Sequence, residues 1–109
     1  MKQHEIWVAE LPLPIGRRPV LLLSRDQAYG VLSRVTVAEV TTTIRQIPVE
    51  VRLGRDEGLP RASVANLDNI HAVAIARLTK KIGGLAAGRA HEVERALGYA
   101  LDIARLKDQ

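Results

Sequence analysis

The sequence predicts a small, mainly β domain, a barrel or sandwich of five or six short strands followed by one C-terminal helix. Apolar and polar residues alternate in short runs over most of the first 80 residues. Glycine- and proline-containing turns separate these runs every eight to twelve residues, which favours a barrel or sandwich over a βαβ sheet. Near the C-terminus the apolar spacing changes to that of a helix.

Six runs have the residue pattern of strands. They cover about residues 6–11, 19–24, 33–42, 49–53, 62–66 and 72–77. The run at 19–24 is apolar almost throughout, as in a strand that is buried on both faces. Between the strands, 25–30 suits a turn or a single helical turn, and 54–60, with two glycines and a proline, suits a turn.

A C-terminal helix is expected over about residues 88–107, after a strand-rich body that spans about 3–82. One face of this helix would carry Val93, Leu97, Ala100, Leu101 and Ala104. A helix of this length can cover one side of a small barrel. Gly98 lies in its interior, where glycine costs about 1 kcal/mol relative to alanine, and is expected to allow close packing on a strand.

Length and composition indicate one domain over residues 1–109. The chain has no cysteine, no signal peptide and no apolar run of the length that spans a bilayer, so a cytoplasmic protein without disulfides is expected. The net charge of +4, from 16 basic and 12 acidic residues, mildly favours an acidic or polyanionic partner. One tryptophan, two tyrosines and no phenylalanine exclude a stacking platform for several bases.

An Arg-Arg-Pro sequence leads directly into the apolar run at 19–24. Pro19 lacks a backbone donor and therefore fits the first residue or an edge of a strand. Arg18 would then be held at the mouth of a rigid strand, where its guanidinium offers a fork of donors suited to a phosphate. The alternative is an ordinary Arg-Pro pair in a loop, with a solvated charge.

Other polar residues follow strand ends. The third predicted strand ends with Thr41, Thr42 and Thr43. These threonines are either ordinary strand formers at a sheet edge or supply hydroxyls that bind phosphate oxygens or a 2′-hydroxyl. Asp68 and Asn69 follow the fifth and suit a turn cap. The three histidines show no metal-ligand spacing, so no metal site is expected. No glycine-rich phosphate loop, nucleophile elbow or Cys-His pair is present.

Six blocks in order resemble the MazF/PemK (Kid) toxins of bacterial toxin–antitoxin pairs. They are Glu5–Val8, Gly16–Ser24, Val37–Thr42, Pro48–Val51, Ser63–Ile70 and Ala76–Gly83, followed by the final helix. The resemblance covers nearly the whole chain. It implies a small SH3-like barrel of the CcdB/MazF type that usually forms a homodimer.

The resemblance also implies an activity and partners. Members of the family mostly cut single-stranded RNA, including messenger RNA, at short sequences and thereby inhibit translation and growth. The cut needs no metal or small-molecule cofactor and leaves a 2′,3′-cyclic phosphate. A cognate antitoxin supplies a flexible, often acidic tail that occupies the RNA groove.

Residue by residue, the resemblance makes Arg18 the family's Arg-Pro arginine and Thr41 the hydroxyl that ends the third strand, so these two are the expected catalytic residues. Expected substrate-binding residues are Arg17, Thr42, Thr43, Arg45, Asp68 and Asn69. Arg18 would neutralise the charge of the phosphorane, and Thr41 would hold a phosphate oxygen or the 2′-hydroxyl. Asp68 would orient Arg18 or accept hydrogen bonds from a base edge.

The sequence departs from the family in the first connection. Pro12–Gly16 is short and lacks the acid that several members use for acid–base work, a role that His4, Arg17 or Glu39 could take instead. Three alternatives therefore stay open beside the ribonuclease. They are a non-enzymatic toxin on the same fold, such as a gyrase poison of the CcdB kind, a homologue that only binds its antitoxin, and a generic small-barrel module that binds RNA or protein.

Overall fold

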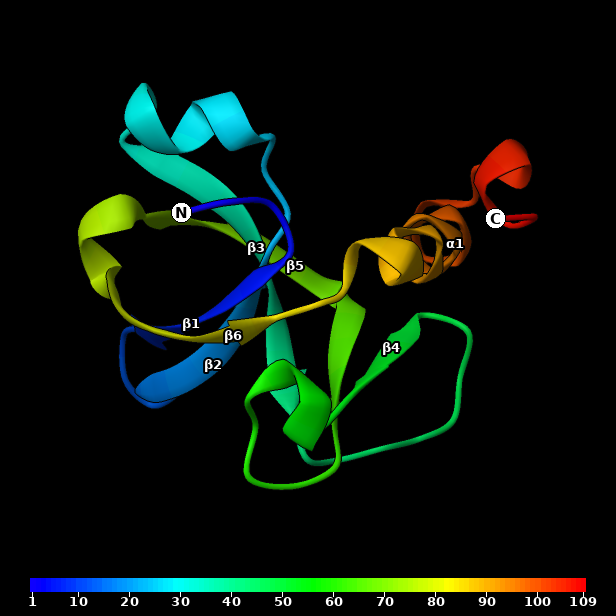
Figure 1. The fold of residues 1–109 in the computed structure, drawn as a ribbon, viewed down its shortest axis with the longest axis horizontal. Helices are drawn as coiled ribbons and strands as arrows, with labels where there is room; N and C mark the ends of the chain where they lie inside the picture. Colours follow the sequence, from blue (N-terminus) through cyan, green and yellow to red (C-terminus); the bar gives the residue numbers. More distant parts are fainter.

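Six antiparallel strands and one C-terminal helix make up the fold (Figure 1), seen in a computed structural model that describes residues 1–109. The strands are β1 (Glu5–Glu10), β2 (Arg17–Leu22), β3 (Arg34–Thr41), β4 (Glu50–Leu53), β5 (Ser63–Ala74) and β6 (Leu78–Gly84). They form one sheet in the order β4-β5-β3-β2-β1-β6, and α1 (Ala90–Leu101) follows. The predicted fold class, mainly β with a C-terminal helix, is confirmed.

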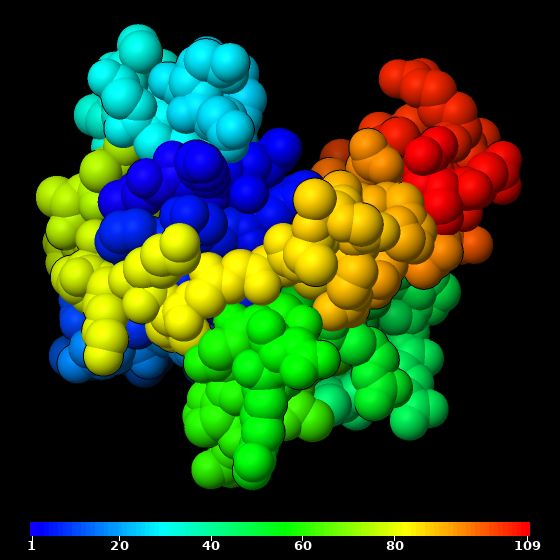
Figure 2. All heavy atoms as spheres, viewed as in Figure 1, coloured from blue at the N-terminus to red at the C-terminus, as the bar shows by residue number.

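The sheet curls until its two edges approach each other, but β4 and β6 form no ladder. The short 3₁₀ helix η2 (Arg55–Glu57), which follows β4, packs on β6 instead (Figure 2). A Cβ atom on Gly83 would overlap the backbone oxygen of Glu57, so glycine is required at this contact. The predicted barrel is thus open in its hydrogen bonding between β4 and β6, where packing replaces the ladder.

The predicted strands at 62–66 and 72–77 are one twelve-residue strand, β5, and this prediction was wrong in detail. β5 carries a bulge: Ala38 of β3 pairs with Ile70, whereas the next residue, Glu39, pairs with Asn66. Residues 67–69 therefore have no partner on β3, and their polar side chains imitated a turn in the sequence. No strand was predicted at β6, because its central residues are exposed and do not alternate in hydrophobicity.

Two apolar clusters lie on opposite faces of the sheet. Alternation along β3 sends Ala38 and Val40 into one cluster and Val35 and Val37 into the other. The first cluster also contains Val93 of α1, so the helix covers this face. The second is covered by the 3₁₀ helix η1 (Asp26–Gly30), the helical turn allowed at 25–30.

The helix is shorter than the predicted 88–107, because Asp102 takes a left-handed conformation (φ 54°, ψ 54°) and ends it. As a result Leu101 and Ala104, expected on the apolar face, are exposed. Gly98 does not pack on a strand. A Cβ atom at this position would overlap Leu106 and Lys107 in the turn that follows the helix. None of the helices has the length and apolar character needed to cross a membrane.

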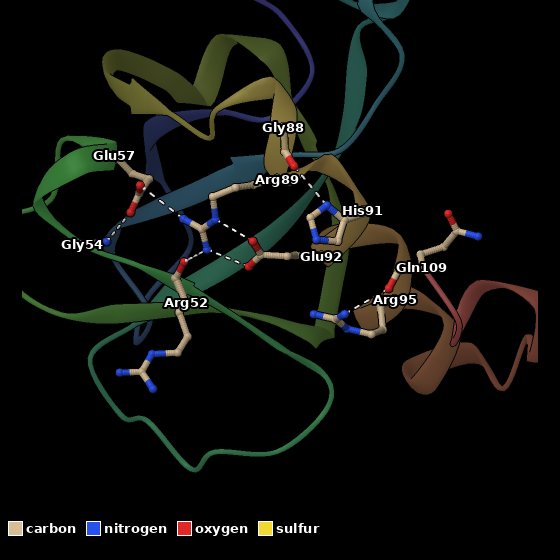
Figure 3. Close-up of polar contacts among 9 residues, drawn as sticks. All are labelled: Arg52, Gly54, Glu57, Gly88, Arg89, His91, Glu92, Arg95 and Gln109. Carbon is tan, nitrogen blue, oxygen red and sulfur yellow. Dashed lines mark hydrogen bonds and ion pairs between the residues drawn. The ribbon is translucent and has the colours of Figure 1, made fainter.

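An ion cluster around Arg89 ties the start of α1 to the β4 edge (Figure 3). Its guanidinium binds Glu92 through two nitrogens, at 2.7 and 2.8 Å, and donates to the carbonyl oxygen of Arg52 at 2.6 Å. A third nitrogen lies 3.3 Å from Glu57 of η2. The hydrogen bond from Arg89 lowers the pKa of Glu92, and the same bond raises the pKa of Arg89. We call these residues the Arg89 cluster.

Candidate functional site

Arg18 and Thr41 face each other across the end of the β2–β3 ladder. The last pair of that ladder is Val20 with Glu39, so continuing the register places Arg18 opposite Thr41 on the same face. This is the face away from α1, because Val20 belongs to the second apolar cluster. Pro19 is the third residue of β2 and precedes the ladder with β3, so the strand has a local edge there, as its missing donor requires.

Two adjoining pockets share Arg18 and Thr41. The larger, of about 280 Å³, is lined by Arg17, Arg18, Pro19, Val40, Thr41, Thr42, Leu59, Pro60, Arg61 and Ser63. The smaller, of about 140 Å³, is lined by Arg18, Thr41, Thr43, Arg45, Asn66 and Asn69. Segments far apart in the sequence thus build two neighbouring pockets around the same arginine and hydroxyl.

The lining of these pockets is strongly basic. Four arginines contribute to it and no aspartate or glutamate does. Threonine and serine hydroxyls and two asparagine amides supply the remaining polar groups. Forked guanidinium donors beside neutral hydrogen-bonding groups suit a phosphate chain with polar bases attached.

The connection between β3 and β4 is fixed by the carboxylate of Glu50. Its two oxygens accept hydrogen bonds from the backbone N–H of Arg45 at 3.1 Å, and one accepts another from Gln46 at 2.9 Å. At the start of the same connection the N–H of Thr43 donates to the hydroxyl oxygen of Thr41 at 3.1 Å. These bonds hold the pocket residues that follow β3 in a defined backbone conformation.

One carboxylate, that of Glu39, contacts Arg18, although Glu39 lines neither pocket. Its Oε1 lies 3.5 Å from Nη1 of Arg18, and its Oε2 lies 3.0 Å from Nε2 of His71. The pairing of Val37 with His71 puts the histidine on the same face as Glu39, two residues along β3. The Glu39 side chain is only 15% exposed. We call Arg18, Glu39 and His71 the Glu39 bridge.

The fold and the pockets match a known family. The family model of the PemK-like, MazF-like toxins of type II toxin–antitoxin systems matches residues 2–101. The chain belongs to this family. A curated Mycobacterium tuberculosis relative named "Probable endoribonuclease MazF5" is 45% identical over 103 residues, which cover 93% of each chain.

Solved structures of family members have the same fold. The Mycobacterium tuberculosis toxin MazF-mt6 superposes with a TM-score of 0.84 at 36% identity, covering 90% of this chain and 96% of that one. A mycobacterial endoribonuclease in complex with its cognate antitoxin superposes with a TM-score of 0.82 at 25% identity, covering 94% and 96%. The resemblance to MazF/PemK toxins that the sequence suggested is therefore confirmed.

The structure brings together seven of the eight residues expected at the MazF-type site. Arg17, Arg18, Thr41, Thr42, Thr43, Arg45 and Asn69 line the two pockets. Asp68 lines neither pocket: it is exposed in the β5 bulge, and its N–H donates to the amide oxygen of Asn66 at 2.9 Å. The carboxylate paired with Arg18 is that of Glu39, not Asp68.

Of the three residues considered as substitutes for the missing loop acid, Glu39 alone contacts Arg18. Arg17 pairs with Glu10 at 3.6 Å. His4 precedes β1 and is half-buried, and this burial lowers its pKa.

Four further residues near the site were not predicted from the sequence: Arg61, Ser63, Asn66 and His71. Arg61 and Ser63 follow the 54–60 turn, and a basic residue directly after such a turn was a usable signal. His71 gave none, because its partner Glu39 is 32 residues away and only the strand register joins them. No three His, Cys, Asp or Glu side chains come together as metal ligands would.

Proposed function

We propose that this chain is a sequence-specific endoribonuclease that cuts single-stranded RNA and acts as the toxin of a toxin–antitoxin pair. The observation that carries the proposal is the pair of pockets around Arg18 and Thr41, lined by four arginines and no carboxylate. Membership of the MazF/PemK toxins and a close relative named as an endoribonuclease support it.

Cleavage proceeds by attack of the RNA's own 2′-hydroxyl on the adjacent phosphorus. The O2′–P bond forms, the P–O5′ bond breaks, and the products are a 2′,3′-cyclic phosphate and a free 5′-hydroxyl. Arg18 binds the phosphate between the two pockets and neutralises the charge that develops on it. Thr41, on the opposite strand, holds a phosphate oxygen or the 2′-hydroxyl. Removing one such donor typically costs about 10²- to 10³-fold in rate.

The two pockets provide places for the nucleotides on either side of the cut. Arg17 and Arg61 border the larger pocket and would contact flanking phosphates. Asn66 and Asn69 border the smaller one, where amides can pair with a base edge and so contribute to the choice of cut sequence. Single-stranded RNA suits the site because its bases are free to enter separate pockets.

The test is cleavage of a long, mixed-sequence single-stranded RNA in EDTA, with both kinds of new end mapped. Wild type is expected to cut at discrete sites and leave 5′-hydroxyl and cyclic phosphate ends, whereas Arg18→Ala leaves the RNA intact. Arg105→Ala removes an exposed arginine in the turn after α1, outside the pockets, and serves as the matched control that still cuts. Circular dichroism shows that each variant is folded. An intact RNA with folded wild type would overturn the proposal in favour of a gyrase poison or a protein that only binds its antitoxin.

The same pockets are the proposed binding surface for the antitoxin. An acidic, flexible segment would present carboxylates to the arginines that otherwise bind RNA. The solved mycobacterial endoribonuclease in complex with its cognate antitoxin supports a partner of this kind. We also propose that the working form is a homodimer, which sedimentation of the purified toxin tests directly.

A further inference from the structure

Glu39 lines neither pocket, but it lies beside Arg18, which lines both, and groups from two neighbouring strands hold it there. Arg18 of β2 lies on one side of its carboxylate at 3.5 Å, and His71 of β5 lies on the other at 3.0 Å. The two contacts use different oxygens. His71 therefore fixes Oε2, while Oε1 points toward the arginine that binds the phosphate.

The contact between Glu39 and Arg18 is loose for an ion pair. Charge-assisted N–H···O bonds are usually about 2.7–2.9 Å long, so at 3.5 Å Oε1 retains the capacity to accept a proton from another donor. Arg18 is free in the same way, because Glu39 is its one carboxylate partner. Because Arg18 lines both pockets and Glu39 lies 3.5 Å from it, a ligand bound by Arg18 would lie close to the Glu39 carboxylate.

We propose that Glu39 is the general base of the cleavage reaction and replaces the acid that the short Pro12–Gly16 connection lacks. This rests on the proposed ribonuclease activity. The 2′-hydroxyl of the bound RNA gives its proton to Oε1 of Glu39 as its oxygen attacks phosphorus. The 5′-oxygen leaves with a proton taken from water, and Glu39 then returns its own proton to water, so the cycle needs no further reactant.

His71 acts in this scheme as a positioning residue. Its Nε2 holds the carboxylate in the rotamer that reaches Arg18. His71 also borders a third pocket of about 430 Å³, which residues of the connection between β1 and β2 line as well. The charged groups around the bridge are Arg18 from β2, Glu10 from β1, Arg34 from β3 and Arg77 after β5.

Single-turnover cleavage over about pH 4 to 8 tests the role, with Glu39→Gln as the main variant. Glutamine keeps the shape and a hydrogen-bond acceptor but takes no proton, so the rate is expected to fall about 10²- to 10³-fold. The rate of wild type should fall in acid, and that acid limb should be absent from the variant. Affinity for an uncleavable RNA with a 2′-O-methyl group at the cut site should stay within about threefold, because Arg18 remains.

Glu5→Gln is the matched control, since Glu5 is also a strand glutamate, 17% exposed and paired with a cation, Lys81, at 3.1 Å. It lies at the far end of β1 and should leave cleavage unchanged. His71→Asn keeps a hydrogen-bond donor to Glu39 without the imidazole ring. We expect its cleavage rate to be about tenfold lower than that of wild type, and the fall of the rate in acid to begin at a higher pH.

The outcomes separate this inference from the function beneath it. If wild type leaves RNA intact, the proposed function fails and the inference fails with it. If wild type cuts and Glu39→Gln cuts as fast, only the base assignment is overturned. A slow Glu39→Gln that has lost affinity for the 2′-O-methyl RNA also overturns it, because Glu39 would then only shape the binding site. If Glu39→Gln does not fold, two other results would overturn the base assignment. One is a wild-type cleavage rate that does not fall in acid. The other is a His71→Asn variant whose rate falls in acid over the same pH range as that of wild type.

Discussion

Two arginine–glutamate clusters in this molecule have similar exposure and opposite character. The side chain of Arg18 is 36% exposed and that of Arg89 is 29% exposed. Arg89 nevertheless makes hydrogen bonds of 2.6 to 2.8 Å to two residues and contacts a second carboxylate, whereas Arg18 has one partner at 3.5 Å. The lesson is that the number of occupied donors, more than burial, separates an arginine that holds the fold from one that is open to a ligand.

The local sequence explains the difference. Arg89 directly precedes α1, so Glu92 lies one turn away and the two form a pair three residues apart. The curled sheet then adds Glu57 and a free carbonyl of the edge strand β4. Arg18 instead projects from a strand, where neighbouring residues point to the opposite face and only a cross-strand residue can reach it.

Of the variants that compare the two arginine clusters, Arg18→Lys is expected to produce the largest effect. Lysine keeps the charge but not the two-pronged fork, so cleavage should fall about 10²-fold while the free energy of unfolding changes by less than about 0.5 kcal/mol. Single-turnover cleavage and urea unfolding measure the two quantities. A loss of stability comparable to the loss of rate would show that the two arginines do not differ as described.

Arg89→Ala should have the converse effect. It leaves the nearly buried carboxylate of Glu57 without its cation and releases α1 from β4, so a loss of about 1–3 kcal/mol in the free energy of unfolding is expected. The cleavage rate per folded molecule should stay within about twofold of wild type. Urea unfolding measures the free energy of unfolding. Titration of the active sites with the 2′-O-methyl RNA gives the concentration of folded molecules by which the cleavage rate is divided.

Salt should distinguish the two clusters. RNA binding at the arginine-lined pockets should weaken roughly tenfold or more over a few-fold rise in salt, because bound phosphates release counterions. The Arg89 cluster is intramolecular and makes short hydrogen bonds, so the urea midpoint should move little over the same range. Fluorescence anisotropy with labelled 2′-O-methyl RNA follows binding, and salt-independent binding would contradict an arginine-lined groove.

The smallest effect expected is on the acid stability of the fold. Arg89 lowers the pKa of Glu92 in the folded chain, so this carboxylate adds stability above the normal glutamate range and loses it as pH falls through the lowered pKa. Unfolding midpoints in urea should therefore drop between neutral pH and about pH 3. The drop should be shallower in Arg89→Ala, and equal drops in the two proteins would exclude this contribution.

Most of the fold could be predicted from the sequence because β1 to β4 are apolar runs of strand length, buried on both faces in β2 and alternating in β4. The parts that failed depend on pairing. The bulge residues Asp68 and Asn69 are polar and resemble a turn, although β5 continues through them. In β6 the residues at 79–81 are exposed and followed by two glycines, so no period marks a strand that is defined only by its partner β1.

In the candidate site, too, residues marked by their local sequence were predictable and contacts set by strand register were not. Arg18 and Thr41 were predictable because each stands at a strand end next to its signal, a proline in one case and two further threonines in the other. The ion pair of Arg18 with Glu39 was not, because Asp68 and Glu39 were equally eligible carboxylates until the β3–β5 register was known. The contact of His71 with Glu39 was not predictable for the same reason, because only the strand register joins these two residues.

The open ladder between β4 and β6 bears on how the chain resists aggregation. Exposed sheet edges invite pairing with strands of other molecules. Here β4 has only four residues, and the side chain of Arg89 occupies one of its carbonyls. At the other edge β6 carries Lys80 and Lys81, while Gly83 is packed against η2. Each edge is therefore short, charged or covered, which lets a strand-rich toxin accumulate without its copies joining edge to edge into fibres.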